Sequence, residues 1–410
     1  MPNIEPYKGV RDFYPQDQRI QTYIFSAMRR AVESFGYEEY NASILESTEL
    51  YTAKTSEEIV NEQTYTFTDR GDRSVTLRPE MTPTVARMVA AKRRDLGIPL
   101  RWYCIQNFFR YERPQRGRLR EFWQLNVDLF GVHGPEADEE MLVIAARVMR
   151  EMGATDSMYE IRVNNRELLK RSIESKLKDP SRYQDAVRLI DKRDKMNADS
   201  FSSAWAELSD TPLDDCLTSD AGVDSLIEKV RARGIPNVVF SPTLARGFDY
   251  YTGMVFEVFD LDPENPRAIA GGGRYDKLIE GYGGEPTPAV GYAMGDVVAR
   301  DFLETHKLLL PLPNTAHLYL APIGDSALAT KTADVLRSEG INVAMGMKHE
   351  KIGDHIKAAT KLGITHFAVC GENESASEEL AIKNLATGNE EKVSLSKVAE
   401  YFLQHTADTH

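Results

Sequence analysis

The sequence predicts an α+β domain built on an antiparallel sheet, with an inserted helical module, followed by a smaller α/β domain. Short segments of alternating polarity, typical of half-buried antiparallel strands, recur between Thr64 and Met294. A charged stretch of helical period interrupts them at about residues 165–234. From residue 316 onward, strands alternate with helices, as in α/β domains. A chain of 410 residues is also too long for one ordinary core.

The first domain is expected to begin with a helix. Apolar residues recur at helical spacing from Gln18 to Phe35, and Gly36 provides a suitable C-terminal stop. Two helices and four strands should follow before the insertion. They are expected at Thr84–Arg94 and Pro135–Met152 for the helices, and at Thr64–Thr68, Ser74–Leu77, Leu100–Phe109 and Glu121–Phe130 for the strands.

After the insertion the strand pattern returns and completes a domain spanning 1–310. The expected strands are Asn237–Phe240, Tyr250–Phe259, Ala268–Gly272 and Ala289–Met294. A proline-containing linker, Pro311 to Asn314, separates this domain from the next.

The second domain, 316–410, is expected to contain a largely parallel sheet. Its predicted elements are strands at Leu318–Ala321, Ile341–Met345 and His366–Cys370, helices at Ser326–Ser338 and Ile352–Leu362, and final segments at Leu380–Leu385 and Val393–Leu403.

Composition indicates a soluble cytoplasmic protein. Hydrophobic content is 42% and charged content 28%. The longest apolar runs, such as Leu308–Leu310, are too short for a membrane span, and the N-terminus lacks a secretory pattern. Three scattered cysteines and eight scattered histidines fit a reducing compartment and predict neither disulfides nor a metal site made of protein side chains. The net charge of −13 counts against a protein coated in nucleic acid, but it permits a local basic groove.

An arginine-rich loop, residues 110–120, joins two of the predicted strands. Its arginines are Arg110, Arg113, Arg116, Arg118 and Arg120. Such a run is often only a solvated hairpin tip. Here apolar, aromatic strands support the loop, and guanidinium groups suit two-pronged binding of phosphate oxygens. A phosphate of ATP or RNA is therefore a candidate ligand.

The segment Leu77–Pro83 places a carboxylate, Glu80, and a hydroxyl, Thr82, at a strand-to-helix junction. Thr82 before Pro83 is suited to cap the helix. Glu80 can face a cleft at the same time, so a structural and a functional interpretation are compatible.

Two glycine-containing segments complete the set of candidates. In Leu244–Tyr251, Arg246 precedes a glycine that permits close approach of a ligand, while one of the two tyrosines should face a core. In Ala270–Asp276, three consecutive glycines form either a flexible turn or a flat floor for a planar ring. No Gly-Lys-Ser/Thr follows, so this is not a phosphate-binding P-loop.

Together and in this order, these segments closely resemble those of the histidyl-tRNA synthetase family, in class II of the aminoacyl-tRNA synthetases. Phe109–Gln124 is similar to class II motif 2, and Leu77–Thr82 to the family's amino-acid-binding loop. Residues 246–251 and 271–276 are similar to its two signatures. The resemblance covers almost the whole chain. It implies a class II catalytic domain and a C-terminal anticodon-binding domain.

The resemblance implies a histidine–tRNA ligase that activates L-histidine with ATP and Mg²⁺, then transfers it to the 3′ end of its tRNA. It assigns Arg110 and Arg246 to catalysis and to ATP binding, the latter together with Glu112. It also implies a homodimer, which the apolar surface of the helix ending at Phe35 favours.

The resemblance also assigns a histidine pocket and the candidates for tRNA contact. The α-ammonium group would be held by Glu80, Thr82 and Gln124, and Met81 would be a further residue of the histidine site. The imidazole would lie between Asp128 and Tyr251, with Tyr250 beside them. The candidates for the tRNA acceptor stem are Arg116, Arg118 and Arg120.

The sequence departs from the family pattern in four places. Ser43 replaces a motif 1 proline, Met81 stands where many relatives have glycine, and Trp123 stands where some have histidine. In motif 3, Val298 occupies the place of the arginine that clamps the ATP γ-phosphate, and Arg300 lies two residues on.

The motif 3 departure leaves an alternative. A paralogue of these enzymes is a non-catalytic, histidine-binding regulatory subunit of ATP phosphoribosyltransferase. It usually lacks the C-terminal domain, which this sequence has.

Overall fold

The computed structural model describes residues 4–52, 63–193, 196–244, 250–347 and 351–406. The chain divides into two compact units, Met1–Leu310 and Pro311–His410. Within the described residues, no helix has the length and apolar character needed to cross a bilayer.

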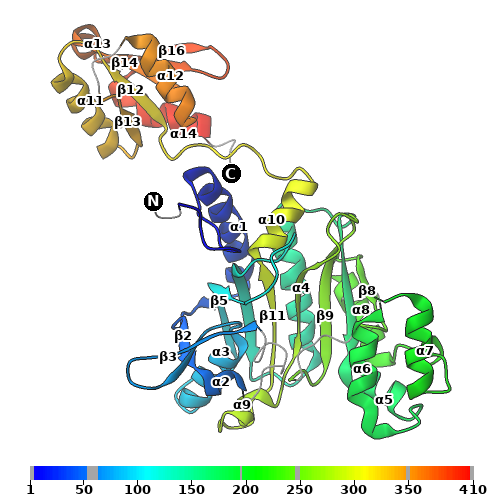
Figure 1. Cartoon of the computed structure of the whole chain (residues 1–410). Coiled ribbons are helices and arrows are strands. Elements are labelled where there is room, and N and C mark those ends of the chain that lie inside the picture. Colours follow the sequence, from blue (N-terminus) through cyan, green and yellow to red (C-terminus); the bar gives the residue numbers. More distant parts are fainter. Residues whose placement is uncertain (1–3, 53–62, 194–195, 245–249, 348–350, 407–410) are drawn as a thin grey trace. The chain divides into compact units, whose positions relative to one another are not determined.

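An eight-stranded sheet forms the centre of the N-terminal unit, with the strand order β1-β5-β6-β11-β10-β9-β7-β8 (Figure 1). The six inner strands pair antiparallel, as expected, whereas β1 runs parallel to β5 and β8 runs parallel to β7. The strands are β1 Glu38–Glu39, β5 Leu100–Phe109, β6 Glu121–Phe130, β7 Tyr159–Asn165, β8 Val238–Phe240, β9 Met254–Asp260, β10 Ala268–Arg274 and β11 Ala289–Gly295.

Helices α1, α4, α8 and α10 build the main core with this sheet (Figure 1). They are α1 Pro15–Glu33, α4 Pro135–Glu151, α8 Ala221–Ala232 and α10 Asp296–Thr305. The apolar stripe of α1, including Ile24, Met28 and Val32, is fully buried in this core. The apolar surface expected to favour a dimer is thus used largely within the chain.

The side chains of β6 alternate between the two faces of the sheet. Leu125, Val127 and Leu129 are buried in the main core. The polar residues that alternate with them line a cavity instead; they are Gln124, Asn126 and Asp128. One strand therefore contributes both to the core and to the candidate site.

A smaller antiparallel sheet, in the order β2-β4-β3, lies in the same unit. Its strands are β2 Leu45–Ser47, β3 Tyr65–Thr68 and β4 Ser74–Leu77, and the short helices of this region are α2 Thr48–Thr52, α3 Thr82–Lys92 and α9 Leu278–Gly281. The N-cap of α3 is Met81, with no side-chain cap. The expected capping role of Thr82 is therefore wrong, because Thr82 is already the first residue of the helix.

The inserted segment has its own small apolar core, which includes Phe201 and Trp205. It contains α5 Arg166–Glu174, η2 Pro180–Arg182, α6 Tyr183–Asp191, α7 Ala198–Leu208 and η4 Leu213–Asp215. Helix α8 follows it, but its buried residues Val223 and Val230 belong to the main core. The module is thus shorter than the helical pattern in the sequence.

The C-terminal unit contains a five-stranded sheet in the order β13-β12-β14-β15-β16. Its elements are β12 Leu318–Pro322, α11 Ser326–Ser338, β13 Val343–Met345, α12 Ile352–Leu362, β14 His366–Cys370, α13 Glu372–Ser377, β15 Glu379–Asn384, β16 Glu390–Ser394, η5 Leu395–Lys397 and α14 Val398–Thr406. Only β13, β12 and β14 are parallel. The expectation of a largely parallel sheet is wrong for β15 and β16, which form an antiparallel hairpin across a turn with Gly388 at φ +82°.

Candidate functional site

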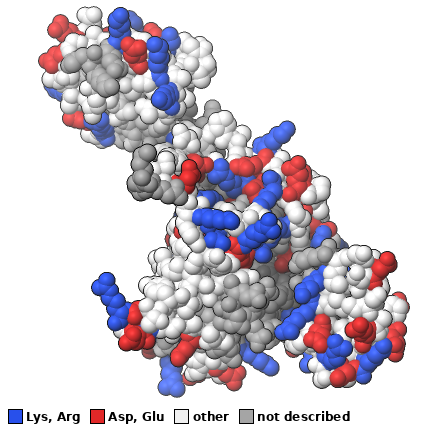
Figure 2. Space-filling view, in the orientation of Figure 1, with Lys and Arg blue, Asp and Glu red and all other residues white. Residues whose placement is uncertain are grey.

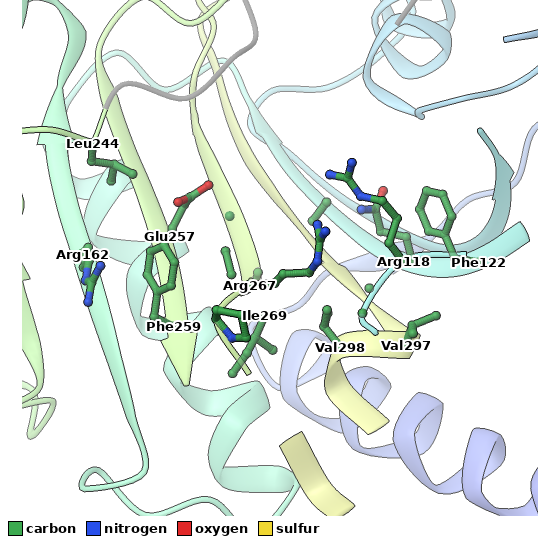
Figure 3. A pocket seen from close by; sticks show the side chains of 18 of the residues that line it. Arg118, Phe122, Arg162, Leu244, Glu257, Phe259, Arg267, Ile269, Val297 and Val298 are labelled. Carbon is green, nitrogen blue, oxygen red and sulfur yellow. The ribbon is translucent and has the colours of Figure 1, made fainter. Parts of the chain in front are cut away.

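Two cavities share part of their walls in the N-terminal unit. The inner cavity, of about 110 Å³, is bordered by polar side chains of β6 and by Glu80, Tyr250 and Tyr275. The outer cavity, of about 690 Å³, is wider and includes the arginine-rich loop and the start of α10 (Figure 3). Four residues line both cavities: Arg110, Gln124, Gly271 and Ala293. A ligand in the inner cavity would therefore meet one in the outer cavity at Arg110.

Asp128 and Tyr275 form the polar end of the inner cavity. The Tyr275 hydroxyl donates a hydrogen bond to Oδ1 of Asp128, and both side chains are buried. Burial raises the pKa of Asp128 to about 7, while the hydrogen bond from Tyr275 lowers it. Gly291 on the neighbouring strand leaves room for this carboxylate, because a Cβ there would collide with Asp128. The site thus contains a carboxyl group that titrates near neutral pH.

Tyr275 was missed as a site residue by the sequence interpretation. Residues two apart on a strand share a face, so Gly271, Gly273 and Tyr275 belong together. Gly271 and Tyr275 both line the inner cavity. This spacing was the signal that could have identified Tyr275.

Glu80 lies elsewhere in the wall of the inner cavity. The Tyr250 hydroxyl donates to its Oε2 over 3.1 Å, and Thr82 lines the cavity beside it. Arg78 holds the preceding backbone, since its fully buried guanidinium donates to the carbonyl oxygens of Asn107 and Ala42. A fixed carboxylate beside a hydroxyl suits an ammonium ligand.

Met81 does not fit the role expected for it. Its side chain is 1% exposed and packs with Cys104 and Phe108 in a small apolar cluster. It is absent from the described residues that line either cavity. Met81 therefore supports the loop from beneath, and its side chain does not border the cavity in which histidine was expected.

Tyr250 and Tyr251 precede β9, which begins at Met254 and not at Tyr250 as expected. Both line the inner cavity, and their ring centroids are 4.9 Å apart. Gly273 makes room for Tyr251, because a Cβ at this glycine would lie 2.9 Å from the ring atom Cδ1. The glycines therefore admit neighbouring side chains to the site.

Arg110 is held at the junction of the two cavities. Its Nε donates to the Pro79 carbonyl oxygen over 2.9 Å, and its guanidinium carbon lies 5.3 Å from the centroid of the Phe122 ring. Burial lowers the pKa of Arg110 and Glu80 opposes that shift, but an arginine remains protonated in proteins. The junction therefore carries a positive charge whose position is set before any ligand binds.

The other expected loop residues have different environments. Glu112 lines the outer cavity and pairs with Arg118, whose Nε lies 2.6 Å from its Oε2. The Arg118 side chain is 43% exposed, which leaves it accessible. Arg116 donates to Asn265 Oδ1 and to the hydroxyl of Thr305.

Arg120 is buried. Its guanidinium lies over the Tyr111 ring and donates to the Tyr7 hydroxyl over 3.0 Å and to the Glu112 carbonyl oxygen. These contacts hold Arg120 inside the protein, away from an RNA backbone. Its expected contact with the acceptor stem therefore has no support in its placement.

Three further arginines were candidates for the site or lie near it in the sequence. Arg274 is buried and binds Asp138 Oδ1 over 2.9 Å, so the arginine of this signature has a structural environment. Arg300 pairs with Asp17 and Glu304 outside both cavities. Arg246 lies outside the described residues.

Charge is distributed unevenly over the surface. In the view of Figure 2, Lys and Arg side chains gather around the hollowed face of the N-terminal unit, with acidic side chains among them. The outer cavity contains the cations Arg110, Arg118, Arg162 and Arg267 and the acids Glu112 and Glu257. This local excess of positive charge occurs in a chain of net charge −13, and it suits a polyanionic ligand.

Comparisons with known proteins identify the family of the chain. The profile of the family described as Histidyl-tRNA synthetase matches residues 9–296, and that of the Anticodon binding domain matches residues 317–405. A histidine–tRNA ligase of Leptospira biflexa is 38% identical, over 97% of this chain and 96% of its own. One of Halobacterium salinarum is 38% identical, over 93% and 94% respectively.

The same fold occurs in a solved structure. A histidyl-tRNA synthetase structure from a Nostoc species matches with a TM-score of 0.80 at 23% identity, over 99% of this chain and 100% of that one. The family profile covers most of the N-terminal unit, and the two ligases match over nearly their full lengths. The chain therefore belongs to the histidyl-tRNA synthetase family of class II aminoacyl-tRNA synthetases.

Proposed function

We propose that the inner cavity binds L-histidine, the outer cavity binds ATP, and the chain ligates histidine to its tRNA. In the first step histidine and ATP give histidyl-adenylate and pyrophosphate. In the second step a hydroxyl at the 3′ end of the tRNA attacks the adenylate, so that the histidyl group passes to the tRNA and AMP leaves. The observation that carries this proposal is the position of Arg110, a half-buried cation that lines both cavities.

The chemistry of activation explains why that position matters. A carboxylate oxygen of histidine attacks the α-phosphorus of ATP, and the bond to pyrophosphate breaks. Negative charge develops on the α-phosphate oxygens, so a cation fixed beside them lowers the barrier. Arg110 is proposed as this cation on one side of the α-phosphate, and Arg246 is proposed for the other side. Glu112 is proposed as a further residue on the ATP side.

Recognition of histidine is proposed to depend on polar partners at both ends of the molecule. Glu80, Thr82 and Gln124 would hold the α-ammonium group, while Asp128 and Tyr251 would hold the two imidazole nitrogens. A site built to hydrogen-bond a substrate rejects apolar analogues strongly, because its own buried polar groups are then left unpaired. The burial of Glu80, Asp128 and Tyr251 supports this proposal.

Mg²⁺ is proposed to accompany the ATP phosphates. No group of three or more metal-ligating side chains occurs in the described part of the chain, so the ion would depend mainly on phosphate and water oxygens. Glu112 and Glu257 are the carboxylates of the outer cavity and suit this hard cation. The ion would neutralise part of the phosphate charge.

The tRNA is proposed to bind with its acceptor end near Arg118 and Arg116 and its anticodon at the C-terminal unit. Phosphate contacts of this kind make affinity fall with increasing salt. We also propose that the protein acts in the cytoplasm, which the three unpaired cysteines Cys104, Cys216 and Cys370 suit.

A homodimer is proposed from family membership. The apolar stripe of α1 is buried within one chain, so it is not available to form a dimer interface. Sedimentation at micromolar concentration should give twice the chain mass, and a monomer there would contradict the proposal.

The function is tested by histidine-dependent exchange of labelled pyrophosphate into ATP, followed by charging of histidine tRNA. Both reactions are expected with the full chain. The regulatory-subunit alternative predicts histidine binding with neither reaction. Exchange that requires another amino acid would contradict the assignment of the inner cavity.

A further inference from the structure

The outer cavity has an apolar side chain where the family pattern places a cation. Val298, on the first turns of α10, lines the cavity. Arg300 lies on the same helix but binds Asp17 over 3.1 Å and Glu304 over 2.8 Å. These two ion pairs hold Arg300 outside the cavity, so it does not replace the missing arginine.

The start of α10 leaves little freedom for rearrangement. Asp296 is 1% exposed and accepts hydrogen bonds from Gln21 Nε2 and from the Trp123 backbone N–H. It also pairs with Arg11 over 2.6 Å. The first turn of the helix is thus fixed, with Val298 facing the cavity.

Arg267 enters the same space from the connection between β9 and β10. The aliphatic part of Arg267 lies close to Gly117 in the arginine-rich loop. A Cβ placed on Gly117 would be 2.8 Å from Arg267 Cδ and 3.1 Å from Val298 Cγ1. The arginine stem therefore lies beside Val298 and the arginine-rich loop. In Figure 3 its guanidinium points into the cavity, between Glu257 and Arg118.

The guanidinium of Arg267 has no direct partner among the described residues, although the charge of Glu112 is near enough to oppose the lowering of its pKa by burial. No described residue forms a hydrogen bond or ion pair with its guanidinium, in contrast to Arg116, Arg118 and Arg300. Burial and the nearby Arg118 both lower the pKa of Arg267, with burial the larger cause. A half-buried cation beside another cation is stabilised by an anion that binds between them.

We propose that Arg267 binds the β- and γ-phosphates of ATP and so takes the place of the motif 3 arginine that is Val298 here. This inference rests on the proposed placement of ATP in the outer cavity. The small side chain of Val298 leaves space for the aliphatic part of Arg267. The cation that the family pattern places at position 298 is thus supplied by position 267, beside the β- and γ-phosphates of the proposed ATP. A guanidinium is suited to this role because it can bind two phosphate oxygens at once.

The test compares Arg267→Ala and Arg267→Lys with the wild type and with Arg300→Ala as the matched control. Three ligands are used: ATP, pyrophosphate, and a non-hydrolysable histidyl-sulfamoyl adenosine, which lacks β- and γ-phosphates. Loss of one charge-assisted contact predicts that Arg267→Ala weakens ATP and pyrophosphate binding roughly 10- to 100-fold. Binding of the sulfamoyl compound should stay near the wild-type value. Arg267→Lys should lie between, and Arg300→Ala should bind ATP normally.

The pattern across ligands separates phosphate binding from a structural role. Equal weakening of ATP and the sulfamoyl compound would show that Arg267 only shapes the cavity, and the inference would be wrong. Unchanged ATP binding, an ATP defect in Arg300→Ala, or a defect confined to tRNA charging would also overturn it. Absence of pyrophosphate exchange in the wild type would instead contradict the proposed function itself.

Discussion

The Tyr275 hydroxyl donates its hydrogen bond to a carboxyl group, Asp128, whose pKa is raised to about 7. Burial raises this pKa, and the hydrogen bond opposes the rise because it favours the ionised form. Tyr275 therefore helps to keep Asp128 charged at neutral pH. A charged carboxylate is the form that accepts a hydrogen bond from an imidazole N–H at full strength.

Histidine recognition should accordingly depend on pH near neutrality. As pH falls from 8 to 6, Asp128 takes up a proton and the KM for histidine should rise more than the KM for ATP. In Tyr275→Phe the lowering contribution is lost, so the pKa of Asp128 rises and the acid limb moves to higher pH. Pyrophosphate exchange measured across this range in both proteins checks the prediction. Free histidine also titrates here, but equally for both, and superimposable profiles would contradict the assignment.

The substitution Asp128→Asn should weaken histidine binding and should stabilise the folded protein at alkaline pH. Asn keeps the shape but not the charge, and charge-assisted hydrogen bonds contribute about 1.5–3 kcal/mol, so the KM for histidine should rise at least tenfold with the KM for ATP little changed. The folded-state pKa of Asp128 exceeds its unfolded value, so its contribution to stability is full below about pH 4 and is lost as pH rises through about 7. The variant should therefore melt higher than the wild type at pH 8, and the difference should shrink toward pH 5. A lower Tm at pH 8 would contradict this account.

Arg274 should matter for folding more than for chemistry. It binds Asp138 over 2.9 Å and donates to the carbonyl oxygens of Val132 and Gly134. Arg274→Met leaves the buried Asp138 without its partner, a loss of about 3–5 kcal/mol in the free energy of unfolding. Denaturant titration checks the value. The double variant Arg274→Met/Asp138→Leu should recover part of the loss, and no recovery would show that the backbone contacts dominate.

Regular elements could be predicted from the sequence, whereas contacts between distant segments could not. Long alternating or helical patterns gave the bounds of β5, β6, α11 and α12 as the structure has them. Arg120 packs against Tyr7, more than a hundred positions away, and no local pattern reports such a contact. The direction of β15 follows from pairing with β14, which periodicity does not encode.

In the candidate site, too, residues on a regular strand could be predicted, whereas contacts between distant segments could not. Gln124 and Asp128 were assigned to the site by the resemblance alone, and the structure places both on the cavity face of β6. The two-residue period of a strand could have shown that they share a face, and it could also have identified Tyr275. Met81 lies in a connection without periodicity, so its burial against Cys104 had no sequence signal. The role of Arg267 depends on its approach to Val298, which is brought about by the fold.

Removal of the C-terminal unit should separate activation from tRNA charging. Each unit has its own apolar core, so a chain ending at Leu310 is expected to fold. Both described cavities lie in the N-terminal unit, so the truncated chain should retain part of its pyrophosphate exchange. Charging of intact tRNA should fall by at least tenfold, because anticodon contacts are lost and with them part of the binding free energy.

The full chain should show a steeper loss of tRNA affinity with salt than the truncated one, because it makes more phosphate contacts. Circular dichroism of the truncated chain provides the control for folding. Equal charging of tRNA by the two proteins would contradict the proposal that the C-terminal unit binds the anticodon, since this unit would then add nothing to tRNA recognition.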